Sequence, residues 1–75
     1  MPLTLAPLGV ECTVTRIGGS PEVKQHLETL GFAPGGCVTV LHSLGGNVIV
    51  RVMESRIAVS RELARNILVS ERRTA

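Results

Sequence analysis

Four side chains of this sequence could ligate a soft or borderline metal ion: Cys12, His26, Cys37 and His42. Structural zinc sites usually combine such residues at close paired spacings, as in Cys-x-x-Cys, and no such pair occurs here. Cys12 alternates in step with Val10 and Val14, which favours a small buried side chain over a ligand. The sequence therefore predicts no metal site and no cofactor, and leaves open only weak or adventitious binding of a divalent ion by a histidine and a carboxylate.

No constellation of residues points to catalysis. The sequence contains no aspartate, and nothing in it places a nucleophile beside an evident base. Gly18-Gly19-Ser20 precedes a predicted helix, as a phosphate-binding loop would, but it lacks the lysine and the glycine spacing of a nucleotide-binding motif. Capping of the helix explains these residues better. We therefore predict a binding module that is not an enzyme and has no small-molecule substrate.

Length and composition indicate one small domain. A chain of 75 residues buries only ~60% of its unfolded surface, yet 44% hydrophobic residues can form a core without disulfides. No segment has the pattern of a signal peptide, and no apolar run approaches the ~20 residues of a membrane span. We expect a cytoplasmic protein that meets a membrane only through a partner, with a domain over residues 1–70 and a disordered basic tail over residues 71–75.

Positive charge gathers in the second half of the chain. The whole chain has a net charge of +2. The arginines at positions 51, 56, 61 and 65, all in the second half, could form a basic stripe. The sequence argues against nucleic-acid binding, because Phe32 is the single aromatic residue and single-strand binders usually stack bases on exposed rings. An ordinary solvated face is the simpler interpretation of the arginines.

Start and stop signals predict one helix at about residues 20–30. Ser20, Pro21 and Glu22 supply an N-cap, a proline suited to the first turn and a carboxylate near the positive end of the helix. Gly31 suits the left-handed position after the helix, and Phe32 suits the hydrophobic contact that often accompanies such a cap.

Alternating apolar residues predict the strands. One strand spans residues 10–17, and later ones lie near residues 38–42, 48–52, 57–59 and 67–69, with His42 on the face of Val38 and Val40. A helical turn capped by Ser60 is expected at about residues 61–66, and residues 3–5 are expected to pair with the last strand. We predict a mainly β fold of five to six short strands, bent and closed into a small barrel around the inserted helix.

Four motifs in this order and spacing resemble the FeoA family, the small cytosolic partners of the bacterial ferrous-iron transporter FeoB. They are Leu-x-x-Leu-Gly at 5–9, Val-x-x-Ile-Gly-Gly at 14–19, Leu-x-x-Leu-Gly-Phe-x-Pro-Gly at 27–35, and Ile-Ala-Val-Ser-Arg-Glu-Leu-Ala-x-x-Ile-x-Val at 57–69. The resemblance implies an SH3-like barrel, binding to the GTPase portion of FeoB and support of iron uptake. The same barrel forms the C-terminal domain of DtxR-type repressors, so a free-standing metal-sensing or nucleic-acid-binding barrel is the alternative.

The helix exit is the predicted partner-binding site. A barrel of this size cannot fully enclose an amphipathic helix together with its exit turn. We therefore expect part of the surface formed by Leu27, Leu30, Gly31 and Phe32 to stay exposed and to bind a partner. The plain alternative is that these apolar side chains pack the helix on the barrel. A homodimer stays open.

Overall fold

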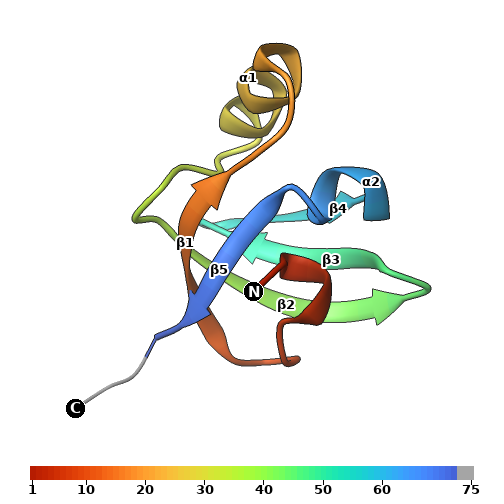
Figure 1. Ribbon diagram of the computed structural model, residues 1–75. Coiled ribbons are helices and arrows are strands. Elements are labelled where there is room, and N and C mark those ends of the chain that lie inside the picture. Colours follow the sequence, from red (N-terminus) through yellow and green to blue (C-terminus); the bar gives the residue numbers. More distant parts are fainter. Residues whose placement is uncertain (73–75) are drawn as a thin grey trace.

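A five-stranded antiparallel sheet in the order β4-β3-β2-β1-β5 forms the body of the computed structural model, which describes residues 1–72 (Figure 1). The strands are β1 (Glu11–Ile17), β2 (Cys37–Leu44), β3 (Asn47–Val52), β4 (Ser55–Val59) and β5 (Ile67–Glu71). The helical elements are η1 (Leu3–Leu5), a 3-10 turn, with α1 (Pro21–Thr29) and α2 (Arg61–Ala64). The predicted mainly β fold with one inserted helix and one short helical turn is confirmed.

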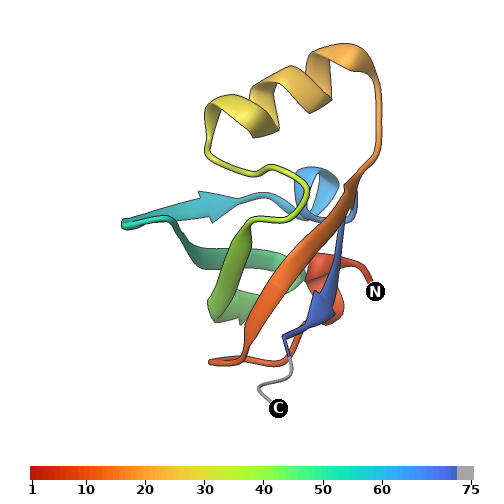
Figure 2. The same cartoon turned by 90° about the vertical axis from the view of Figure 1, so that its left-hand side faces the viewer.

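The sheet curves around the core without a hydrogen-bonded ladder between its two edge strands in the described residues (Figure 2). The outer edge of β5 meets the amino terminus instead. The Val69 N–H donates to the Met1 carbonyl at 2.7 Å, and the Met1 ammonium donates to the Val69 carbonyl at 2.9 Å. The chain start therefore covers one edge that would otherwise be open to strand pairing.

The first residues pair with β5 differently from the prediction. Pro2, rather than the segment 3–5, forms the bridge to Leu68. Leu3–Leu5 forms η1, in which the Leu5 N–H donates to the Pro2 carbonyl at 3.0 Å and the Ala6 N–H to the Leu3 carbonyl at 3.1 Å. This turn places Leu3 in the core, where it is fully buried.

Two irregularities in register change which side chains face inward. The pairing of β1 with β5 shifts between Val14 and Arg16, so Val14 and Ile17 are both buried despite their odd spacing. The pairing of β2 with β3 shifts between Val40 and His42. His42 is consequently exposed and opposite Ile49, and the prediction that it shares the inner face of Val40 is wrong.

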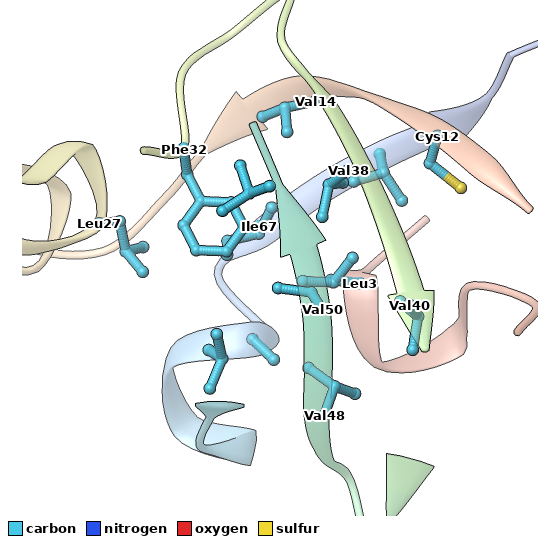
Figure 3. Close-up of a cluster of buried hydrophobic side chains, with 14 of the residues drawn as sticks. Leu3, Cys12, Val14, Leu27, Phe32, Val38, Val40, Val48, Val50 and Ile67 are labelled. Atoms are coloured by element: carbon cyan, nitrogen blue, oxygen red, sulfur yellow. The ribbon is translucent and has the colours of Figure 1, made fainter. Parts of the chain in front are cut away.

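The core is built mostly from β-branched side chains on the inner face of the sheet (Figure 3). The buried valines come from all five strands: Val14, Val38, Val40, Val48, Val50, Val52, Val59 and Val69. Phe32 is fully buried, and Figure 3 shows its ring between Leu27 of α1 and the sheet. The single aromatic residue thus joins the helix to the barrel.

The caps of α1 agree with the predicted signals. The Val23 N–H donates to the Ser20 hydroxyl at 3.3 Å, which confirms the N-cap. At the other end, the Gly31 N–H donates to the Glu28 carbonyl and the Phe32 N–H to the Leu27 carbonyl, both at 3.0 Å. This is the Schellman pattern, in which a left-handed residue, here Gly31 at φ +107°, turns the chain back against the last helical turn.

Residues 71 and 72 are more ordered than predicted. Glu71 is the last residue of β5, and the Arg72 N–H donates to the Glu11 carbonyl at 3.0 Å. Because this bond extends the contact of the last strand with β1, the predicted disordered tail begins too early by these two residues. The rest of that tail, residues 73–75, lies outside the described part of the chain.

Replacing Gly31 by alanine should destabilise the protein by about 1–2 kcal/mol, because a β-carbon is strained in the left-handed conformation. The space itself is available, since the nearest heavy atom would be the Met53 sulfur at 3.5 Å. Gly18→Ala is the matched control: its φ is ordinary and its new β-carbon would meet only the Asn66 carbonyl at 3.6 Å. Urea unfolding of both variants measures the difference, and equal loss in the two would contradict the cap.

Candidate interaction surface

The four residues at the end of α1 that were predicted to contact a partner differ in exposure and fall into two pairs. Leu27 and Phe32 are 0% exposed, whereas Leu30 and Gly31 are exposed in part. The Schellman turn folds Phe32 back beside Leu27, so both side chains close the end of the barrel beneath α1 (Figure 3). In this conformation Leu27 and Phe32 are core residues, and the expectation that they stay available to a partner is corrected. Contact through Leu30 and Gly31 stays a prediction.

A methionine that sequence reasoning missed completes the surface at this point. Met53 lies in the two-residue turn between β3 and β4 and is 79% exposed. Its φ of +56° is left-handed, a conformation that non-glycine residues adopt rarely. Its sulfur lies against Gly31. We call Leu30, Gly31 and Met53 the helix-exit surface. An apolar residue in a tight turn was the only signal for it in the sequence.

An apolar hollow lies on the outer face of the sheet. It has a volume of about 470 Å³ and lies along the last residues of β2, the first residues of β3 and the last residues of β4. Its exposed lining includes Leu44 at 80% and Ile49 at 42%, together with Ala58 and His42. We call it the hairpin groove. The sequence did not predict it, because the register shift after Val40 brings His42 beside Ile49.

The four potential metal ligands do not come together. Cys12 is buried in β1, His26 is on α1, and Cys37 and His42 lie five residues apart along β2, roughly 15 Å at the usual strand rise. Within residues 1–72, no three histidine, cysteine or acidic side chains are grouped as a metal site would require. The absence of a resident metal stays a prediction.

Arg72 joins an exposed cluster at the start of β2. Its guanidinium donates to the Glu11 carboxylate at 2.7 Å and to the Cys37 sulfur at 3.2 Å. The hydrogen bond to Glu11 raises the pKa of Arg72, which is charged at physiological pH in any case. Both side chains of the ion pair are more than half exposed, so its stabilising effect is small.

The predicted basic stripe is split. Arg51 of β3 and Arg56 of β4 are directly opposite one another. Arg61 lies at the other end of β3, where its N–H donates to the Asn47 side-chain oxygen at 2.9 Å. The arginines therefore do not form the continuous track that a nucleic-acid backbone follows.

No helix in the described residues has the length and apolar character needed to cross a membrane. The helices present are short: α1 has 9 residues and α2 has 4.

Comparison with known proteins shows the family. The model of the FeoA domain matches residues 1–71. A protein assigned as Fe(2+) transport protein A in Methanocaldococcus jannaschii is 33% identical over 70 residues, which cover 93% of this chain and 85% of that protein. The chain therefore belongs to the FeoA domain family, and the resemblance carried by the four motifs is confirmed.

Solved structures agree on the fold. An iron uptake regulatory protein (FeoA) is 30% identical with a TM-score of 0.86, covering 92% of this chain and 93% of its own. Stenotrophomonas maltophilia FeoA in complex with zinc, described as an SH3 domain protein, has a TM-score of 0.79 at 24% identity, with 93% and 89% covered. The SH3-like fold is thereby confirmed.

One further likeness concerns the fold alone. A manganese-dependent transcriptional repressor has a TM-score of 0.86 at 20% identity. The match covers 95% of this chain and 41% of the repressor chain. A shared barrel at this level of identity does not carry over a function.

The two cysteines should differ strongly in reactivity toward a thiol reagent. Cys37 is exposed and Cys12 is 0% exposed, with its sulfur 3.6 Å from the Val10 carbonyl. A disulfide-exchange reagent should label one thiol rapidly in the native protein and the second only on unfolding. Cys37→Ser should remove the fast phase and leave the slow one. Rapid labelling of the Cys37→Ser protein would contradict the burial of Cys12.

Cys12 should also make stability depend on pH. Burial raises the pKa of its thiol, the Glu71 carboxylate adds to the rise and the amino terminus opposes it. Above about pH 8.5 the unfolded chain releases this proton while the native chain keeps it, so the free energy of unfolding falls as pH increases. The stability advantage of the natural protein over Cys12→Ala should shrink between about pH 7 and about pH 10. Denaturant unfolding at several pH values measures it, and a constant difference would contradict the prediction.

Proposed function

We propose that this protein is a non-enzymatic cytoplasmic accessory protein of ferrous-iron uptake that binds the GTPase domain of an FeoB-type transporter. The observation that carries the proposal is the match of the FeoA domain to residues 1–71, nearly the whole chain. The name of the archaeal relative, an Fe(2+) transport protein A, supports the same process. The accessory role agrees with a surface that offers apolar contacts and, over residues 1–72, no recognisable catalytic group.

The helix-exit surface is the contact we propose for this partner. Leu30 and Met53 present apolar atoms, and Gly31 between them has no side chain, which lets a partner approach the backbone closely. Leu30 and Gly31 form the turn that ends α1, Met53 lies in the β3–β4 turn, and Leu30 packs in part against the core. Binding residues placed on loops that a rigid scaffold positions are typical of recognition sites.

The alternative is a free-standing barrel that senses metal or binds nucleic acid, as the repressor likeness would suggest. Two observations weigh against nucleic acid. Phe32 is 0% exposed, so its ring cannot stack on a base, and the arginines are split between the two ends of β3. Tight, salt-sensitive binding of a single-stranded oligonucleotide would favour the alternative.

The proposal predicts that the isotope-labelled full chain binds the isolated cytosolic GTPase domain of the FeoB from the same organism. In a two-dimensional NMR titration, shifts should gather on Leu30, Gly31 and Met53. Leu30→Glu should weaken binding by roughly tenfold or more, because it places a charge in an apolar contact. The titration should be run with and without guanine nucleotide, since a nucleotide-dependent affinity would tie the contact to the GTPase cycle.

The control variant is Leu5→Glu, which changes a leucine that is 70% exposed and lies in η1. It should fold and bind as the natural protein does. If Leu30→Glu folds and binds normally, the helix-exit surface is not the contact. If the natural protein shows no shifts at high concentrations of the GTPase domain, the proposed partner is wrong.

A further inference from the structure

Two arginines oppose each other on the outer face of the sheet. Arg51 of β3 and Arg56 of β4 are a directly paired position, at which β-carbons lie about 4.5–5.5 Å apart. Like charges in this arrangement destabilise a sheet. The one ion pair among residues 1–72 joins Arg72 to Glu11, so neither opposed arginine forms an ion pair within the described chain. Glu11 lines a hollow together with Arg51 but is paired with Arg72.

A charged residue on an edge strand can simply guard against unwanted strand pairing. That explanation covers Arg56, because β4 is an edge strand. It does not cover Arg51, which lies on an interior strand with β2 on its other side. Neither arginine is ion-paired within the described chain, and an anion that binds both would relieve the repulsion between them.

The hairpin groove lies next to this pair on the same face. Side chains alternate along a strand, so Ile49 shares a face with Arg51, and Ala58 shares one with Arg56. Ile49 and Ala58 are themselves opposite one another, which makes them the adjoining row of the same outer face. They line the groove together with Leu44, and its volume of about 470 Å³ lies within the usual size range of binding pockets.

We propose that the outer face of β2, β3 and β4 is a docking surface for an acidic segment of a partner protein. Carboxylates of the segment bind Arg51 and Arg56, and its apolar side chains fill the hairpin groove. Charge complementarity supports this occupant, because the surface joins two guanidinium groups without an ion-pair partner in the described chain, which bind carboxylates well, to an apolar hollow. The surface consists of other residues than the helix-exit surface but adjoins it, since Arg51 and Met53 line one hollow. The inference stands whether or not the transporter is the partner.

The composition of the surface favours a peptide over nucleic acid or free phosphate. No aromatic side chain is available to stack on a base, since Phe32 is buried. A phosphate ion could bridge the two arginines but would leave the hollow over Leu44 and Ile49 unfilled. An acidic segment with leucines satisfies both parts of the surface.

The test titrates the isotope-labelled full chain with a short, terminally blocked peptide of glutamate and leucine residues, followed by NMR that includes the arginine side-chain signals. Shifts should gather on Arg51, Arg56, Ile49 and Leu44. Arg51→Gln and Arg56→Gln should each weaken binding by roughly tenfold. Neither should lower the stability of the fold, because each removes a repulsion, so loss of binding cannot be attributed to unfolding.

Three comparisons complete the design. Arg65→Gln, which changes an exposed arginine outside the surface, should bind the acidic peptide as the natural protein does. A peptide with glutamine in place of glutamate should bind at least tenfold more weakly, as expected when charged partners are lost. Inorganic phosphate and an oligothymidylate should bind more weakly than the acidic peptide.

The inference is overturned by any of four results. These are no binding of the acidic peptide, shifts that map away from β3 and β4, undiminished binding by both arginine variants, and tighter binding of phosphate or oligothymidylate. The helix-exit surface and its proposed partner would be untouched by any of them.

Discussion

The burial of Phe32 against Leu27 is the contact on which the arrangement of α1 depends. Leu27 is the one fully buried residue of the helix, and α1 has only sparse backbone contact with the sheet (Figure 2). A helix of 9 residues is marginal in water by itself, so tertiary packing must hold it. The Schellman turn at Gly31 directs Phe32 to this contact. The shape of the helix end thus follows from one glycine, one leucine and one phenylalanine.

This anchoring also determines which residues are left for recognition. Once Leu27 and Phe32 close the end of the barrel, the chain between them must pass over the surface. Residues 28–31 do so: Glu28 and Thr29 are exposed, Leu30 and Gly31 are exposed in part, and the β3–β4 turn brings Met53 beside Gly31. The position of the helix-exit surface is therefore a by-product of the packing that holds α1, and a partner that binds there contacts a rigid point of the fold rather than a free helix.

Local signals in the sequence predicted the helices and strands well. They did not predict the register in which the strands pair, because that register depends on residues far apart in the chain. The caps at Ser20 and Gly31 depend on residues adjacent in the chain, so residue type sufficed. The bulge after Val40 depends on how β2 pairs with β3, and no nearby glycine or proline marks it. It reversed the expected side of His42 and created part of the hairpin groove, which is why the predicted site included the helix exit and omitted the outer sheet face.

The inner and outer faces of the sheet affect stability differently. The inner face is almost entirely valine, isoleucine and leucine, and it supplies the hydrophobic stabilisation that a chain of 75 residues needs without disulfides. The outer face keeps features that lower stability: opposed arginines at 51 and 56 and a left-handed Met53. Neutral replacements at positions 51 and 56 and a glycine at position 53 should therefore raise the stability of the protein. Arg51 and Met53 line one hollow, so these features lie where the two proposed binding surfaces meet, and functional sites are where proteins most often give up local stability.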